Sequence, residues 1–262
     1  MAASFQPPID YLDVSVLPGA LVSADQLALA RQRYAWARDF CRDADVLELA
    51  CGPGLGWTTL RPVARSLLLA DVSTPMVERA RRVADAGAVL RMDAQRLALP
   101  DASRDVVLLF EAIYYLPDIS AFAGEVARVL RPGGTLLIAT SNPDLFDFHP
   151  SPHSHGYLGV VGLRSALEQA GLKDMRAWGS APVASGLRGF LRLVKWAVAG
   201  SGFMPGSMRA KQWLRRLVQG KLQPMPSDLQ VDAAPPLPAP AALRVDRAAK
   251  GHRILLVAAT RC

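Results

Sequence analysis

The sequence predicts a doubly wound α/β domain built on a parallel sheet. Five strand-like runs alternate with helical segments between residues 45 and 140. The run at residues 106–110 is apolar throughout, which is typical of a central strand buried on both faces. Gly52, Gly54 and Gly56 follow the first run, and Asp71 ends the second. This arrangement is typical of a βαβ unit that binds a nucleotide-like ligand.

The chain divides into four parts. A capping box at residues 23–26 predicts a helix that continues to about residue 40. We expect an N-terminal cap helix region at residues 1–41, an α/β core at 42–182, a basic helical and Pro-rich insertion at 183–250, and a final core strand at 251–262. The predicted strands are 45–50, 66–71, 88–92, 106–110, 135–140, 173–180 and 253–260. The predicted helices inside the core are a segment after the glycine loop, 76–85, 119–130 and 163–170.

Composition excludes several classes of protein. The net charge is +7, but residues 186–222 alone hold eight Lys or Arg and no Asp or Glu, so the rest of the chain is close to neutral. No motif of a nucleic-acid-binding fold accompanies this charge, and we expect no nucleic-acid partner. No apolar run is long enough to span a membrane, and no signal-peptide layout opens the sequence. The separated Cys41, Cys51 and Cys262 are expected to be reduced thiols, so the predicted location is cytoplasmic.

The stretch from Glu48 to Gly56, Glu-Leu-Ala-Cys-Gly-Pro-Gly-Leu-Gly, resembles the first motif of the class I S-adenosylmethionine-dependent methyltransferases. Further stretches resemble later motifs of that family in the same order: Asp71 with Ser73 and Met76, then Met92-Asp93-Ala94, then Arg131-Pro-Gly-Gly134. The resemblance implies a seven-stranded Rossmann-like sheet whose last strand pair is antiparallel, here with a helical insertion before the final strand. It also implies S-adenosylmethionine as the cofactor.

The resemblance assigns roles to the matching residues. Gly52, Gly54 and Gly56 would let the backbone approach the cofactor, and Glu48 would orient its amino-acid tail. Asp71 would bind both ribose hydroxyls. The remaining cofactor contacts would come from Ser73, Met76, Met92, Asp93, Ala94 and Phe110. A nicotinamide-dependent oxidoreductase would also place an acid after its second strand, but the glycine spacing, the Asp93-Ala94 pair and the Pro-Gly-Gly turn count against it.

The candidate acceptor side follows the fourth strand. Glu111 is either a general base or acceptor ligand, or an acid that caps a helix. Tyr114 and Tyr115 are expected to form pocket walls. His149, His153 and His155 lie in one short loop after the fifth strand, and histidine is a natural base for a hydroxyl. The alternative is a polar surface loop, and the two prolines between these histidines argue against a metal site.

The basic insertion combines an apolar stripe with arginines. Residues 187–222 could form a lid whose arginines, Arg215 and Arg216 among them, meet an anionic or lipid-linked acceptor. They could equally form a peripheral contact with the inner face of a membrane, or a solvated face.

These observations predict a methyltransferase that acts on a small molecule, with O-methylation of a sugar-, lipid- or natural-product-type hydroxyl. The alternatives are C- or N-methylation of a quinone-like or lipid-like acceptor, or a non-catalytic S-adenosylmethionine-binding protein associated with a membrane.

Overall fold

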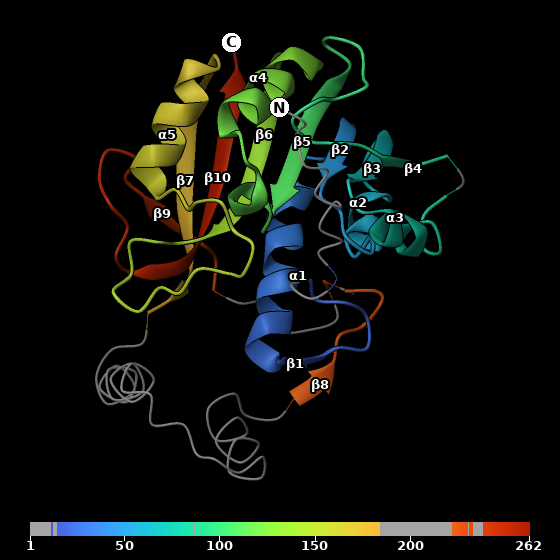
Figure 1. Cartoon of the computed structure of the whole chain (residues 1–262), viewed down its shortest axis with the longest axis horizontal. Coiled ribbons are helices and arrows are strands. Elements are labelled where there is room, and N and C mark those ends of the chain that lie inside the picture. The colour runs from blue at the N-terminus through green and yellow to red at the C-terminus, as the bar shows by residue number, and fades with distance from the viewer. Residues whose placement is uncertain (1–11, 13–14, 86, 184–221, 230, 233–237) are drawn as a thin grey trace, which may run out of the picture.

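A single large mixed sheet organises the chain (Figure 1). The computed structural model describes residues 12, 15–85, 87–183, 222–229, 231–232 and 238–262. The strands of this sheet lie in the order β4-β3-β2-β5-β6-β10-β7-β9. Their bounds are β2 Asp45–Leu49, β3 Ser66–Asp71, β4 Val89–Arg91, β5 Arg104–Phe110, β6 Leu130–Ser141, β7 Leu172–Pro182, β9 Ala241–Leu243 and β10 His252–Arg261.

The parallel half of the sheet is the part that the glycine loop and the strand-end acids predicted. β2 pairs in parallel with β3 on one side and with β5 on the other, so Leu49 stands opposite both Ala70 and Leu109. The apolar residues of these strands are buried except Leu68, which is partly buried, as expected for strands covered on both faces. The carboxyl ends of β2, β3 and β5 therefore reach the same edge of the sheet, where ligands of such folds bind.

The predicted antiparallel pair is confirmed. β10 lies between β6 and β7 and runs antiparallel to both, with Val257 opposite Ile138 on one side and Ala177 on the other. The seven predicted strands are present, and β9 adds a short eighth strand on the outer edge of β7. This strand has three residues and lies inside the predicted insertion, where a segment that short has no recognisable alternation.

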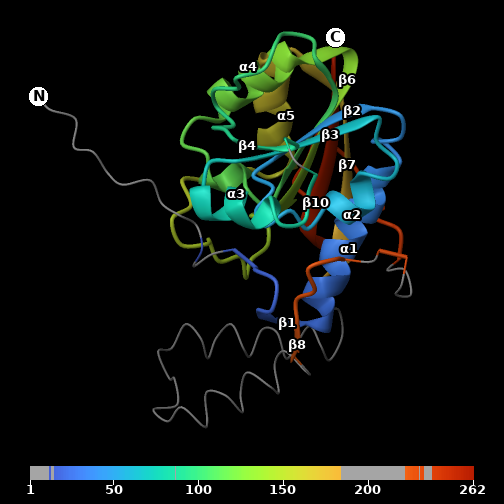
Figure 2. The same ribbon diagram turned by 90° about the vertical axis from the view of Figure 1, so that its right-hand side faces the viewer.

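Helices cover both faces of the sheet (Figure 2). One apolar core lies under α4 (Ile119–Val129) and α5 (Val160–Gln169), and the other lies under α1 (Ala24–Arg38) and α2 (Trp57–Leu60). The predicted capping box is present at the start of α1, because Ser23 and Gln26 each accept a hydrogen bond from the backbone N–H of the other. α3 (Thr74–Ala80) is shorter than its prediction.

The predicted turn at Arg131-Pro-Gly-Gly134 lies inside a strand. β6 begins at Leu130, opposite Arg104, and resumes regular pairing with Thr135 opposite Val106. The four residues between them face a single residue of β5 and form a bulge, in which Gly133 has a φ of +80°. The bulge aims Arg131 Nη1 at Asp105 Oδ1 (2.6 Å) and Asp45 Oδ2 (3.0 Å), which joins the amino ends of β5 and β2.

The described part of the insertion packs on the core. β8 (Leu222–Pro224) pairs antiparallel with β1 (Leu21–Ser23), and Met225 and Leu229 are buried against α1. Arg31 Nε on α1 donates to the Leu229 carbonyl oxygen at 2.6 Å. The predicted insertion helices, together with Arg215 and Arg216, lie outside the described residues. Within the described ranges, none of the helices has the length and apolar character needed to cross a membrane.

The capping box offers a test of how α1 is held. Ser23→Ala removes the acceptor for the Gln26 backbone N–H, and such a loss costs about 1 kcal/mol of unfolding free energy. Urea denaturation should show this loss. Ser165→Ala, an exposed serine inside α5, is the matched control and should change stability by less than about 0.5 kcal/mol. Equal stabilities for the two variants would contradict the capping role.

Candidate functional site

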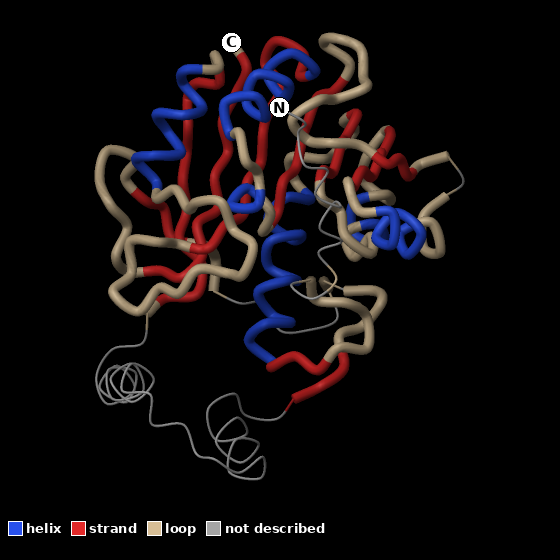
Figure 3. The backbone as a smooth tube through the Cα atoms, in the orientation of Figure 1, coloured by secondary structure: helices blue, strands red, loops and turns tan. Residues whose placement is uncertain are grey.

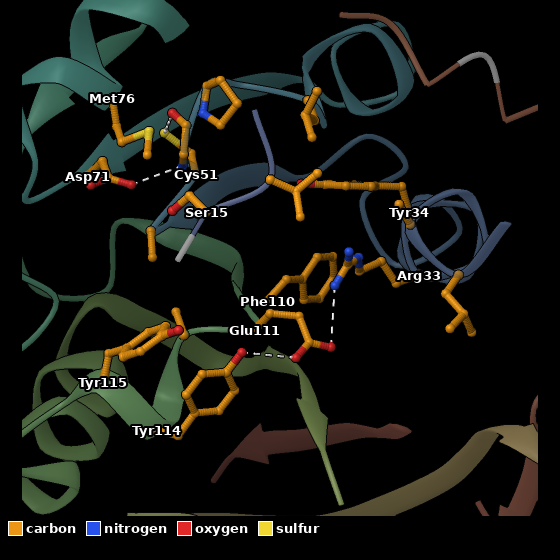
Figure 4. A pocket seen from close by; sticks show the side chains of 18 of the residues that line it. Ser15, Arg33, Tyr34, Cys51, Asp71, Met76, Phe110, Glu111, Tyr114 and Tyr115 are labelled. Carbon is orange, nitrogen blue, oxygen red and sulfur yellow. Dashed lines mark hydrogen bonds and ion pairs between the residues drawn. The ribbon is translucent and has the colours of Figure 1, made fainter. Parts of the chain in front are cut away.

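A cavity of about 450 Å³ opens at the carboxyl ends of β2, β3 and β5. This volume lies within the range of about 300 to 1,000 Å³ that is typical of small-molecule sites. Its walls come from the ends of these strands, from one face of α1, and from Ser15, Val16, Val22 and Met225 beside the β1–β8 pair. Figure 4 shows the side chains of the glycine loop and of β3 on one side of the cavity, with Glu111, Tyr114 and Tyr115 on another.

The glycine loop is shaped by backbone conformation and by a close approach. Gly52 and Gly54 have φ values of +55° and +83°, which favour glycine. Gly56 has no such requirement, but a Cβ there would lie 2.3 Å from the Tyr34 ring and 2.7 Å from Glu48 Oε2. The first two glycines therefore set the path of the loop, and the third lets Tyr34 and Glu48 pack against it.

Asp71 ties this loop to β3. Its Oδ2 accepts a hydrogen bond from the Gly52 backbone N–H and its Oδ1 accepts one from the Ser73 backbone N–H, both at 2.9 Å. The carboxylate is buried and lines the cavity. Burial raises the pKa of Asp71, while the backbone N–H donors act in the opposite direction. Each oxygen keeps lone-pair capacity for a further donor.

Glu48 lies behind the glycine loop and does not line the cavity. Its Oε1 accepts a hydrogen bond from the Tyr34 hydroxyl at 2.6 Å, while its Oε2 is buried and has no hydrogen-bond partner among the described residues. Burial raises the pKa of Glu48 from its ordinary 4.5 to about 7, against a lowering by the Tyr34 hydrogen bond. Tyr34 was missed as a site residue because its helical spacing indicated only a core position.

Some of the remaining cofactor candidates line the cavity, and the others lie behind its wall. Lining the cavity are Gly52, Met76, Met92, Asp93, Ala94 and Phe110. Behind the surface lie Gly54, Gly56 and Ser73, which shape the loop or anchor Asp71. The Asp93 carboxylate is exposed and accepts a hydrogen bond from the Gln95 backbone N–H at 2.9 Å.

Glu111 follows β5 with a left-handed backbone, at a φ of +52°. Such a conformation is costly for a residue with a side chain and clusters at functional sites. Its Oε1 lies 3.3 Å from Arg33 Nη1, and its Oε2 accepts hydrogen bonds from the Tyr114 hydroxyl (3.2 Å) and the Ser141 hydroxyl (3.3 Å). Figure 4 shows Arg33 and Tyr114 with their dashed contacts to Glu111 at one side of the cavity. Burial raises the pKa of Glu111, while Arg33 is the largest opposing influence.

Tyr114 and Tyr115 line the cavity as predicted walls. Tyr114 also stacks on Tyr157, with ring centroids 4.4 Å apart, and the Tyr115 hydroxyl shares a hydrogen bond of 2.6 Å with the Ser151 hydroxyl. The aromatic wall is therefore braced from outside by the connection between β6 and α5, which Figure 3 draws as a loop.

The structure does not bring the three candidate histidines into the cavity. His149, His153 and His155 are exposed on the loop that braces the tyrosines, and none of them lines the cavity wall. The loop leaves the ligand-binding edge of the sheet, as expected, and it is joined to the aromatic wall by the stacking of Tyr157 on Tyr114 and by a hydrogen bond from the His155 backbone N–H to the Tyr114 carbonyl oxygen at 2.8 Å. Across the described ranges, no group of three His, Cys, Asp or Glu side chains is arranged to hold a metal ion.

The cavity suits a ligand that carries positive charge near hydroxyl groups. Asp71, Asp93 and Glu111 line it, and Arg33 is its one basic lining residue within the part of the chain that the structure describes. Carboxylates accept hydrogen bonds from ribose hydroxyls and amino groups and stabilise a cation nearby. A sulfonium cofactor with a ribose and an adenine fits this set of residues.

Comparison with known proteins agrees with this geometry. Residues 47–138 match the family model described as a methyltransferase domain. A probable S-adenosylmethionine-dependent methyltransferase of Mycobacterium tuberculosis is 36% identical over 143 residues, which is 53% of this chain and 52% of the relative. A malonyl-[acyl-carrier protein] O-methyltransferase of Hahella chejuensis is 32% identical over 182 residues, covering 66% of this chain and 60% of the relative.

A solved structure shows the same fold. A crystal structure from Thermotoga maritima, described as a SAM-dependent methyltransferase, superposes with a TM-score of 0.58 at 13% identity, over 91% of this chain and 94% of the other. The chain spans about half the length of the first of these curated relatives. Residues 47–138 thus match a methyltransferase domain, as the motifs predicted, and S-adenosylmethionine is the cofactor named for the relatives.

The burial of Glu48 predicts a pH dependence of stability without cofactor. Between about pH 4.5 and 7 the folded chain holds a proton that the unfolded chain has released, so unfolding free energy falls as pH rises through this window. The glutamine in the Glu48→Gln variant cannot ionise, so the variant should lack the part of the decrease that is due to Glu48. That part is on the order of 2 to 3 kcal/mol between pH 5 and pH 8. Urea melts of both proteins at pH 5 and pH 8 measure the difference. Parallel pH profiles would show that Glu48 does not titrate in this range.

Proposed function

We propose that this chain is a methyltransferase that moves a methyl group from S-adenosylmethionine to an oxygen of a small acceptor. The observation that carries the proposal is the pairing, in one cavity, of a cofactor half around Asp71 with a second half around Glu111. Methyl transfer is an in-line displacement, so the protein contributes mainly alignment and exclusion of water.

The cofactor half is proposed to work as follows. The Asp71 oxygens are held by backbone donors and would accept hydrogen bonds from the two ribose hydroxyls. Met76, Met92 and Ala94 would enclose the adenine, and Asp93 would accept from its amino group. The glycine loop would bind the amino-acid tail of the cofactor. Glu48 packs behind this loop, against Gly56 and Tyr34, and would help to orient the tail.

The acceptor half is proposed to centre on Glu111. Its three contacts measure 3.2 to 3.3 Å, longer than the 2.6 Å bond that holds Glu48, so the carboxylate can exchange partners. A carboxylate in partly desolvated surroundings is a competent general base for a hydroxyl. The description of one relative as an O-methyltransferase supports oxygen over carbon or nitrogen.

The proposed step conserves atoms and charge. The acceptor hydroxyl gives its proton to the Glu111 carboxylate, and its oxygen lone pair attacks the methyl carbon. The bond between that carbon and sulfur breaks, and its electron pair stays on sulfur as a neutral thioether. The products are a methyl ether, S-adenosylhomocysteine and a protonated Glu111 that returns its proton to water.

Two further proposals concern the basic insertion. A lipid-linked acceptor, and a contact of Arg215 and Arg216 with it or with a membrane surface, concern residues outside the described ranges. The described cavity supports an acceptor with apolar character by itself, because Val22, Leu29 and Met225 line it.

Two variants separate the halves of the site. Glu111→Gln should lower turnover by about 10² to 10⁴, the usual contribution of a general base, while affinity for S-adenosylhomocysteine stays the same.

Asp71→Asn should instead weaken S-adenosylhomocysteine binding by about tenfold or more, because it loses a charge-assisted hydrogen bond. Calorimetry gives the affinities, and transfer of a labelled methyl group to a panel of hydroxy acids, phenols and sugars gives turnover.

The proposal fails if no member of a broad panel is methylated while the parent binds S-adenosylhomocysteine tightly. It also fails in its assignment of the base if Glu111→Gln turns over as the parent does.

A further inference from the structure

Arg33 is a partly buried arginine, and its described contacts leave most of its N–H donors unused. Its side chain is 23% exposed, and its one ion pair in the described chain is the 3.3 Å contact with Glu111. Its charge also acts to lower the pKa of Glu48 behind the glycine loop. By contrast, Arg131 bridges two aspartates at 2.6 and 3.0 Å, and Arg128 donates to Glu125 and Asp101 at 2.6 to 2.9 Å. A guanidinium has five N–H donors in a planar fork, so Arg33, which lines the cavity, keeps donors that its described contacts do not use.

The wall that leads to Arg33 is apolar. Gln26, Leu29, Ala30 and Arg33 all line the cavity, and their spacing places them on one face of α1. Seven residues of helix span about 10 Å, so this face carries an apolar strip between a polar amide and a cation. Val22 and Met225 extend the apolar surface beyond the strip. A ligand that fits this strip has an apolar body and one anionic end.

We propose that Arg33 selects the acceptor by binding its carboxylate, so that the acceptor is a hydroxy acid with an apolar body. This inference rests on the proposed methyl transfer to oxygen. The two oxygens of an acceptor carboxylate can pair with two N–H groups of the guanidinium fork. Glu111 makes only one contact with Arg33, at 3.3 Å. The acceptor carboxylate takes the place of Glu111 beside Arg33, and Glu111 is then released to accept the proton of the acceptor hydroxyl.

One other carboxylate could reach this cavity, because the methionine tail of the cofactor also ends in one. The position of Arg33 favours the acceptor. Its partner Glu111 follows β5, whereas the glycine loop and Asp71 follow β2 and β3, and Figure 4 shows Arg33 and Glu111 away from Asp71 and Met76. The two sources predict different effects of the same substitution, so one experiment separates them.

The experiment measures binding of decanoate to the full chain saturated with S-adenosylhomocysteine, with decanamide as the uncharged twin. The parent should bind decanoate more tightly than decanamide. Arg33→Gln should weaken decanoate binding by about 10- to 100-fold and leave decanamide unchanged, and Arg33→Lys should retain part of the preference. Arg42→Gln removes an exposed arginine that lies 3.9 Å from Asp39, and it controls for the loss of a positive charge.

Two results overturn the inference. If Arg33→Gln lowers affinity for S-adenosylhomocysteine itself by tenfold or more, Arg33 holds the cofactor tail. If the parent does not prefer decanoate, or Arg33→Gln binds it equally well, Arg33 does not recognise an acceptor carboxylate. Both results come from binding measurements and do not depend on turnover. A failure of the proposed methylation would be seen separately, because S-adenosylhomocysteine would not bind or no methylated product would form. Unchanged melting temperatures confirm that each variant is folded.

Discussion

The in-register alignment of β2, β3 and β5 is the constraint on which the site depends. Parallel pairing brings the carboxyl ends of these strands to one edge, where Asp71 can receive the Gly52 backbone N–H at 2.9 Å. That single hydrogen bond joins the loop after β2 to the end of β3. A slip of one residue in either pairing would move every side chain to the opposite face and would separate Asp71 from the glycine loop.

α1 connects the two halves of the cavity through neighbouring residues. Tyr34 donates to Glu48 on β2 at 2.6 Å, while Arg33 pairs with Glu111 after β5 at 3.3 Å. The helix is itself held by its capping box and by Arg31, which donates to the Leu229 carbonyl oxygen of the insertion. A shift of this helix would therefore change the surroundings of both acids together.

The sequence predicted the part of the site that depends on local pattern. Glycines that need a positive φ and acids at strand ends carry their signal within a few residues, so the sequence could single out Gly52, Gly54 and Asp71 as candidates. Arg33 and Tyr34 were not found as site residues, because their partners are separated from them by 78 and 14 positions and their own spacing shows only a helix face. The histidine loop follows β6 as predicted, but His149, His153 and His155 are exposed and do not line the cavity, which a local sequence pattern does not reveal.

The fold shows the same division. The alternation of strands and helices predicted the parallel half of the sheet, and the family resemblance implied the antiparallel final pair. β9 and the bulge in β6 were missed, since both depend on pairing with a distant strand instead of on a local pattern.

The central claim is that one cavity orients S-adenosylmethionine with its ribose on Asp71 and its methyl group toward Glu111. A crystal structure of the chain with S-adenosylhomocysteine tests it most directly. We expect both ribose hydroxyls within hydrogen-bonding distance of the Asp71 carboxylate and the sulfur facing the space between Phe110, Glu111 and Arg33. A ligand whose ribose contacts other residues, or whose sulfur faces away from Glu111, would contradict it.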